Sequence, residues 1–234
     1  MAASTGKRAG MAGAEGTTGQ GRGGMSAERR RRVRLEVSRE ASRLFWTHGV
    51  EATSGDQIAA AVGLSTRTIW RHFRSKESCA EPIVMSSVDW ELDTLRNWPL
   101  GLSLEDHFRA EALRHGREAT PTEREDIALG IKMIRLGDSE PAIRTAWLMA
   151  CDQVERQMAE IIAKRLGGEP DDVEIRLHAA AAGAALRVLN EHVGAGLLDG
   201  ASPEDFLGTP ERIAHAVRRA TGGAVGDPVT GGTG

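Results

Sequence analysis

The spacing of apolar residues constrains the fold of this 234-residue chain more than any other feature of its sequence. Between residues 27 and 220 they recur at steps of three and four, as on one face of an α-helix, and no run of alternating β-branched residues is long enough for a strand. Gly and Pro interrupt the pattern repeatedly. We therefore predict an all-α protein, with a short helix around Ile58 and others at about 27–48, 66–73, 76–97, 103–118, 122–136, 140–166, 170–198 and 202–220.

Local sequence also predicts how the first helices begin and bend. Thr53 or Ser54 is placed to cap the second helix, with a polar residue three positions on as in a capping box. Ser65 caps the third. Pro82 falls inside the helix predicted at 76–97, where its missing N–H would kink the axis.

Composition divides the chain into four segments. Residues 1–25 are rich in Gly, Ala and Thr without apolar periodicity, which predicts a disordered tail, and residues 221–234 are interpreted in the same way. Between the tails we predict an N-terminal domain over 26–80 and a helical bundle over 81–220.

Charge differs sharply between the two domains. Residues 26–80 carry eleven Arg or Lys against six acids, whereas residues 81–234 carry sixteen against twenty-six. Four of the bases form the run Arg29 to Arg32, just before the first helical stripe. The N-terminal domain is therefore suited to a polyanion and the C-terminal domain is not.

Several classes of protein are disfavoured by the sequence. No apolar run approaches the roughly 18 to 20 residues of a membrane span, and no signal-peptide core is present, so we expect a cytoplasmic protein without a membrane partner. Cys79 and Cys151 are too few and too far apart for a disulfide framework or a metal site. We find no nucleophile with a base and no phosphate loop, and therefore expect neither an enzyme nor a cofactor.

The segment DQIAAAVGLSTRTIWRHF, residues 56–73, has the pattern of a helix-turn-helix. Gly63 allows the tight turn between two short helices, and apolar residues on both sides supply a shared core. The second helix keeps a polar outer face suited to phosphates and base edges, made of Ser65, Thr66, Arg67, Thr68, Arg71 and His72.

These residues resemble the TetR family of bacterial repressors. The resemblance covers residues 33 to about 80: VxxxAxxLFxxxG from Val37 to Gly49, followed by TSxxxIAxxVGLSxxTIWxHFxSKE from Thr53 to Glu77. It implies an N-terminal three-helix DNA-binding domain and a C-terminal helical bundle for ligand binding and dimerisation. The implied partners are double-stranded operator DNA, an unknown small-molecule effector and a second copy of the chain.

The resemblance also implies roles at the DNA. Ser65 and Thr68 would bind phosphate at the start of the recognition helix, and Thr66 and Arg67 would enter the major groove, with Arg67 on a guanine. Lys76 would meet a phosphate with help from the helix dipole. The full set of expected DNA-binding residues is Thr53, Ser65, Thr66, Arg67, Thr68, Trp70, Arg71, His72 and Lys76.

Two positions depart from the family pattern. Trp70 stands where the family usually has Tyr, so it either stacks on a sugar or a thymine methyl or closes the core of the helix-turn-helix. Gly55 replaces a larger residue and weakens its helix.

The sequence leaves the roles of two basic features open. Lys76 is either the phosphate contact that the resemblance implies or a solvated side chain. The run Arg29 to Arg32 is either an arm that tracks the DNA backbone or a solvated tail.

The bundle is expected to supply the dimer interface and the effector pocket. The Ala- and Gly-rich segment 177–189 would allow close helix packing, either between copies or within one chain. Apolar contacts are expected from Leu186, Leu189, Val193, Leu197, Phe206, Ile213 and Val217. The pocket is expected between the helices of residues 83–165, lined by Trp90, Trp98, Phe108, Met133, Trp147, Met149 and Cys151.

The expected function is therefore a repressor that an effector releases from a palindromic operator through a shift of the fourth helix. An activator and a nonspecific nucleoid-associated protein are the competing hypotheses.

Overall fold

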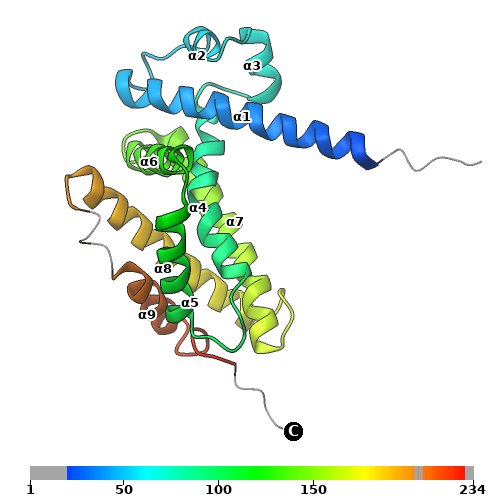
Figure 1. Ribbon diagram of the computed structural model, residues 1–234, viewed down its shortest axis with the longest axis vertical. Helices are drawn as coiled ribbons and strands as arrows, with labels where there is room; N and C mark the ends of the chain where they lie inside the picture. Colours follow the sequence, from blue (N-terminus) through cyan, green and yellow to red (C-terminus); the bar gives the residue numbers. More distant parts are fainter. Residues whose placement is uncertain (1–19, 203–204, 206–207, 230–234) are drawn as a thin grey trace, which may run out of the picture. The chain divides into compact units, whose positions relative to one another are not determined.

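The computed structural model describes residues 20–202, 205 and 208–229 (Figure 1). These residues form helices and connecting turns without a strand, which confirms the all-α prediction. Residues 1–33 and 34–234 form two units, and helix α1 (Gln20–His48) holds residues of both. The rest of the fold belongs to the second unit.

Three helices make up the N-terminal domain: the second half of α1, α2 (Gly55–Ala61) and α3 (Thr66–His72). The three helices share a core of fully buried side chains, which includes Val37 and Phe45 from α1, Ile58 from α2 and Ile69 from α3. Because these positions lie on one stripe of each helix, burying them fixes which face of α3 remains outside.

Local capping sets the ends of α2 and α3. Ser54 caps α2: its side chain accepts from Gln57 N, and the Gln57 side chain accepts from Ser54 N, so the capping box is complete. Ser65 caps α3 by accepting from Thr68 N. Gly63 has a φ of 64°, which only glycine adopts without strain, and it makes the turn between the two helices.

Helix α1 begins at Gln20 rather than at the predicted Ala27, so it includes part of the predicted N-terminal tail. The added residues 20–26 include three glycines, which are poor helix formers, so the extension continues a helix nucleated by tertiary packing rather than one favoured by its own residues. Arg29 to Arg32 lie in α1 just after this extension, with exposed side chains. Residues 1–19 of the predicted tail lie outside the described residues.

The fourth predicted helix, 76–97, is in fact a short 3₁₀ turn (Glu77–Ala80) followed by α4 (Glu81–Arg96). Pro82 therefore lies in the first turn of α4, where a helix needs no N–H, and the predicted internal kink is wrong. The next amide, Ile83 N, donates to the buried Ser38 hydroxyl of α1 at 3.0 Å. This bond joins the start of α4 directly to the N-terminal domain.

Five more helices complete the bundle: α5 (Leu104–Glu118), α6 (Pro121–Leu136), α7 (Pro141–Leu166), α8 (Val173–Leu198) and α9 (Thr209–Ala220). The two longest, α7 and α8, pack along each other, while α4 packs on α6 and α7 and α9 packs on α5 and α8 (Figure 1). The last helix starts at Thr209 rather than near residue 202, and Phe206 lies outside the described residues.

Residues 221–229 pack onto the bundle, which corrects the prediction of a disordered tail for this stretch. Val225 is buried, and Leu104 N donates to Gly226 O at 2.8 Å. Arg165, itself buried on α7, donates to Asp227 O and to carbonyls of residues 98–102, while its guanidinium lies 3.2 Å from the Trp98 ring centroid. One arginine thus ties together the end of α7, the α4–α5 connection and the C-terminal segment.

Candidate DNA-binding surface and ligand pocket

Helix α3 presents a polar face because its apolar face is locked into the N-terminal domain. Ile69 of α3 and Phe73, the first residue after the helix, are buried. The Arg34 guanidinium lies 4.8 Å from the Phe73 ring centroid. Arg34 also donates to His72 O at 2.7 Å, which fixes the end of α3 against α1. The opposite face of the helix is therefore held outward on a rigid support.

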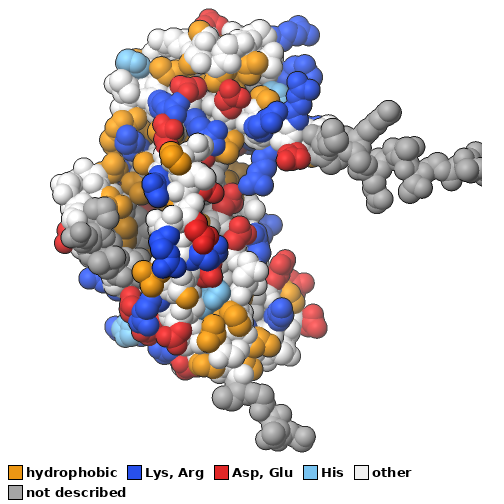
Figure 2. Space-filling view, in the orientation of Figure 1, with side chains coloured by type: hydrophobic (Ala, Val, Ile, Leu, Met, Phe, Trp, Pro, Cys, Tyr) orange, Lys and Arg blue, Asp and Glu red, His pale blue; other side chains and the backbone are white. Residues whose placement is uncertain are grey.

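The outward face carries the basic side chains that the sequence predicted there. Arg67 and Arg71 are exposed, and neither makes an ion pair with a residue in the described part of the chain. Lys and Arg side chains gather at the surface around α3 (Figure 2). A cation without an internal partner retains its full charge for an external anion.

Hydroxyl groups on α3 are already hydrogen-bonded within the domain. Ser65 Oγ and Thr68 Oγ1 are 2.8 Å apart, and Thr66 Oγ1 donates to Asp56 Oδ1 at 2.6 Å. Ser65 remains exposed, whereas Thr66, Thr68 and His72 are half-buried. These side chains shape the start of the recognition helix, and the arginines supply its charge.

The two departures from the family pattern contact each other. A Cβ built on Gly55 would lie 2.3 Å from Cζ2 of Trp70, so only glycine leaves room for the indole at the start of α2. Trp70 is 43% exposed. It is therefore neither a core residue nor a free one, since one edge of the ring packs on α2 and the remainder faces solvent.

Two of the predicted DNA contacts point inward. Thr53 is 1% exposed, and its hydroxyl donates to Gly49 O at 2.8 Å, so this side chain is not available to a phosphate. Lys76 Nζ donates to three carbonyls of the α1–α2 connection, Val50 O at 2.6 Å, Thr53 O at 2.9 Å and Glu51 O at 3.1 Å. Lys76 is therefore neither a phosphate contact nor a solvated side chain, because it stabilises the domain from within.

A cavity of about 400 Å³ lies among α4, α5, α6, α7, α8 and the start of α9. Trp90, Phe108 and Trp147 line it as predicted, and isoleucines of α6 and apolar residues of α8 close it. It reaches further along the chain than the predicted range of 83–165, because α8 and α9 provide one wall.

Four predicted pocket residues do not line this cavity. Trp98 packs under Arg165, and Met133 is an ordinary core residue with no exposed area. Met149 is 52% exposed on the outer side of α7, and Cys151 lies on α7 beyond the cavity wall. The sequence shows which residues are apolar but not which side of α7 faces inward.

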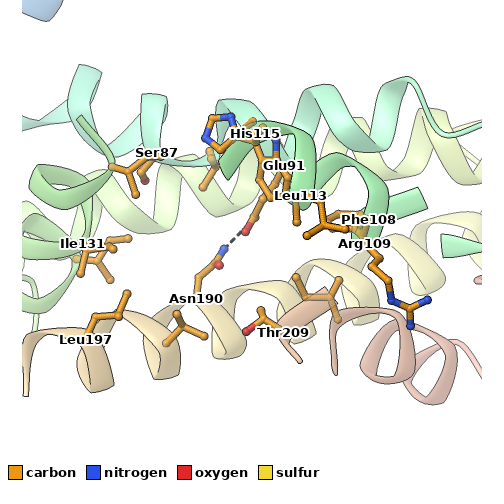
Figure 3. A pocket seen from close by; sticks show the side chains of 18 of the residues that line it. Ser87, Glu91, Phe108, Arg109, Leu113, His115, Ile131, Asn190, Leu197 and Thr209 are labelled. Atoms are coloured by element: carbon orange, nitrogen blue, oxygen red, sulfur yellow. Dashed lines mark hydrogen bonds between the residues drawn. The ribbon is translucent and has the colours of Figure 1, made fainter. Parts of the chain in front are cut away.

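The cavity contains polar residues that the sequence analysis missed. Glu91 of α4 and Asn190 of α8 face each other across it, and Asn190 Nδ2 donates to Glu91 Oε2 at 2.9 Å (Figure 3). Burial raises the pKa of Glu91 to about 7 against the opposing effect of this hydrogen bond. Glu91 could have been found from the sequence, because it is an acid at a position of its helix where the apolar stripe faces inward.

Three further polar atoms at the cavity are buried without a partner among the described residues: Trp90 Nε1, His115 Nε2 and Thr209 Oγ1. The His115 ring lies against Trp90, with centroids 5.3 Å apart. Buried polar atoms are usually satisfied, so unsatisfied ones on a cavity wall mark a place where a guest could bond.

The N-terminal domain is joined to the cavity wall through α6 as well as α4. Arg39 of α1 makes a two-bond ion pair with Asp126 of α6, at 2.6 and 2.8 Å, and Arg43 pairs with Glu125 at 2.5 Å. The next residue of α6, Ile127, lines the cavity. The residue of α6 that pairs with α1 and the residue that lines the cavity are therefore neighbours in the sequence.

Comparison with known proteins identifies the family. Residues 39–83 match the model of the bacterial regulatory proteins of the tetR family, and residues 107–199 match the model described as the MftR C-terminal domain. The chain is 35% identical over 153 residues to the HTH-type transcriptional regulator TcmR of Streptomyces glaucescens, covering 64% of this chain and 67% of that protein. The chain belongs to the TetR family. It is a DNA-binding transcriptional regulator, and the family and its relatives are regulators rather than enzymes.

Solved structures show the TetR fold independently of close sequence similarity. GusR of Salmonella enterica superposes with a TM-score of 0.51 at 20% identity, covering 82% of this chain and 94% of that chain. A TetR-family regulator from Mesorhizobium loti gives the same TM-score and identity, with coverages of 85% and 98%. Among the described residues no helix is long and apolar enough to cross a membrane.

Proposed function

We propose that this TetR-family regulator is a repressor that binds a palindromic operator as a homodimer and is released by a small apolar effector. The observation that carries the proposal is the pair of exposed arginines on α3, Arg67 and Arg71, in the same chain as a cavity of about 400 Å³ lined by aromatic and aliphatic side chains. Arginine offers a bidentate contact to guanine, and a cavity of this size suits a small molecule.

The proposed DNA contacts are those of the outward face of α3. Arg67 reads a base in the major groove. Arg71 and His72 contact the phosphate backbone of the DNA, and the exposed edge of Trp70 contacts a sugar or a thymine methyl group. Ser65, Thr66 and Thr68 support the start of the helix. Thr53 and Lys76 are not part of this set, because both are occupied inside the domain.

A homodimer is supported by apolar side chains left exposed on the two longest helices. Leu148 and Met149 of α7 and Leu177 and Val188 of α8 are each about half exposed. Much of the apolar set predicted for the interface is used elsewhere: Leu186, Ile213 and Val217 are buried within the chain, and Val193 and Leu197 line the cavity. An exposed α7–α8 face is self-complementary in a two-fold dimer, and such a dimer presents two recognition helices to one duplex.

Effector release is proposed to act through the two connections already described. A guest in the cavity contacts α4 at Ser87 and Trp90 and α6 at Ile127. Helix α4 leads back to α3, and α6 is held to α1 by Asp126. A displacement of either helix changes the spacing of the recognition helices, and operator DNA must weaken effector binding by the same factor.

The proposal is tested by gel shift with the DNA upstream of the chain's own gene. Arg67→Ala should weaken binding by about five- to 150-fold for each recognition helix, since a bidentate arginine–guanine contact is worth about 1–3 kcal/mol. Arg212→Ala, which removes an exposed arginine of α9, is the matched control and should bind as the unmodified chain does. Equal affinity of both variants would exclude Arg67 as a base contact.

The dimer is tested by sedimentation with Leu148→Glu and Val188→Glu, which should dissociate it because a charge would be buried in the interface. Leu100→Glu changes an equally exposed leucine of the α4–α5 connection and should leave the dimer intact. Transcription of a reporter from the bound promoter separates repression from activation. Protection of a single palindrome, rather than of the whole fragment, separates both from nonspecific binding.

A further inference from the structure

The cavity contains a buried acid whose negative charge has no balancing cation. Glu91 is 9% exposed, and its hydrogen-bond partner, Asn190, is a neutral amide. No Arg, Lys or His in the described part of the chain lies within ion-pair distance of this carboxyl group. A carboxylate in such a position is stable only when it takes up a proton or gains a cationic partner.

The cations around the cavity are already paired with other acids. Arg109 of α5 binds Glu105 and Glu211, and Arg144 and Arg187 both bind Glu191. Cys151 is neutral, because burial raises its pKa to about 12. The other charged or titratable side chains that line the cavity are Arg109 and His115 of α5. Arg144, Arg187 and Glu191 form an ion-pair network near Cys151 on α7 and α8. None of the arginines is left over for Glu91.

The remaining walls favour a cation that also has a large apolar body. Trp90 and Phe108 meet edge to face with ring centroids 6.0 Å apart, and Trp147 adds a third aromatic side chain. The face of an aromatic ring attracts a cation, and more strongly where water is excluded. Isoleucines of α6 supply apolar surface without charge.

We propose that the cavity selects apolar ligands that carry a protonated amine, and that Glu91 is the counter-ion of that amine. The inference rests on the proposed effector pocket and names the chemical class that it takes. A carboxylic acid is repelled by Glu91, and a neutral alcohol leaves the buried carboxylate without a balancing charge. Asn190 holds the carboxyl group in place and leaves its second oxygen for the ligand.

Glu91 also makes amine binding depend on pH. In the free protein the pKa of Glu91 is about 7, so the carboxyl group is mostly neutral at pH 6 and mostly ionised at pH 8. An alkylammonium group, with a pKa of about 10, keeps its proton at both. Only the ionised carboxylate forms the ion pair. The fraction of protein molecules that can bind the amine in this way therefore rises about tenfold from pH 6 to pH 8.

Isothermal titration calorimetry with three matched probes tests the inference on the full chain. The probes are 2-(2-naphthyl)ethylamine, 2-(2-naphthyl)ethanol and 2-naphthylacetic acid, which share one aromatic body and differ in charge. At pH 8 the amine should bind at least about tenfold more tightly than the alcohol, since a charged hydrogen bond contributes roughly 1.5–3 kcal/mol. Its affinity should fall about tenfold at pH 6, while the affinity of the alcohol changes little.

Glu91→Gln keeps the size of the side chain and removes its charge. In this variant the amine should lose its advantage over the alcohol and its pH dependence, whereas Glu160→Gln, at an exposed acid of α7, should retain both. Circular dichroism confirms that both variants are folded. Loss of the pH dependence in Glu91→Gln also excludes His115 as its source.

Equal binding of amine and alcohol to the unmodified chain, tighter binding of the acid, or an unchanged amine preference in Glu91→Gln would overturn the inference. So would the absence of binding by all three probes. The proposed repressor function is decided separately, by the gel shift with Arg67→Ala, and a pocket that accepts neutral ligands would leave it intact.

Discussion

Replacing Gly55 by alanine tests the contact between the two residues that depart from the family pattern. The new Cβ would lie 2.3 Å from Cζ2 and 2.9 Å from Cη2 of Trp70, whereas carbon atoms in contact lie about 3.5–4.0 Å apart. The indole must therefore move by more than about 1 Å. This movement removes its packing on the start of α2.

The magnitude follows from two opposing effects. Overpacking costs about 1–3 kcal/mol, and the half-exposed Trp70 can swing away, which places the cost near the middle of that range. Alanine in place of glycine stabilises a helix by at most about 1 kcal/mol. We expect Gly55→Ala to lower the free energy of unfolding by about 1 kcal/mol.

A double-mutant cycle measures the contact itself. In a Trp70→Ala background the overlap is gone, so the same Gly55→Ala change should raise the free energy of unfolding by up to about 1 kcal/mol. The coupling between the two positions is then about 2 kcal/mol. Urea unfolding followed by circular dichroism provides the four values, because the signal does not depend on the deleted tryptophan.

Gly116→Ala is the matched control for this cycle. Gly116 lies in α5, and a Cβ there would meet no atom within 4 Å. This substitution should stabilise the protein in both backgrounds equally. Effects of Gly55→Ala and Trp70→Ala that add to within about 0.5 kcal/mol would refute the reasoning.

Three further outcomes follow from the contacts described above. Lys76→Ala should lower the free energy of unfolding by about 2 kcal/mol in urea melts, because three carbonyls lose a charged donor, and an unchanged midpoint would show that water replaces it. A chain that ends at Ala220 should lose about 2 kcal/mol and melt at a lower temperature, since it lacks the buried Val225 and one carbonyl partner of Arg165, Asp227 O; full retention of the melting temperature would contradict a packed C-terminal segment. Arg39→Ala should lower the free energy of unfolding by about 1–2 kcal/mol and reduce the effect of an effector on operator affinity, and an unchanged ratio of affinities with and without effector would exclude the Asp126 ion pair from the transmission.

The sequence alone determined the features that depend on neighbours within a few positions. The capping box of Ser54, the cap by Ser65 and the turn at Gly63 need partners no more than four residues away, so the helix-turn-helix and its outward face were predictable. The apolar period placed the core residues of most helices for the same reason. The family resemblance in residues 33 to about 80 rested on these positions.

Only the tertiary structure decided the features that join distant segments. Lys76 reaches carbonyls 23 to 26 positions earlier, and Glu91 meets Asn190 across 99 positions. The outward position of Met149 is set by how whole helices are rotated against each other. A one-dimensional pattern carries the period of a helix but not that rotation, which is fixed when all the helices bury their apolar faces together.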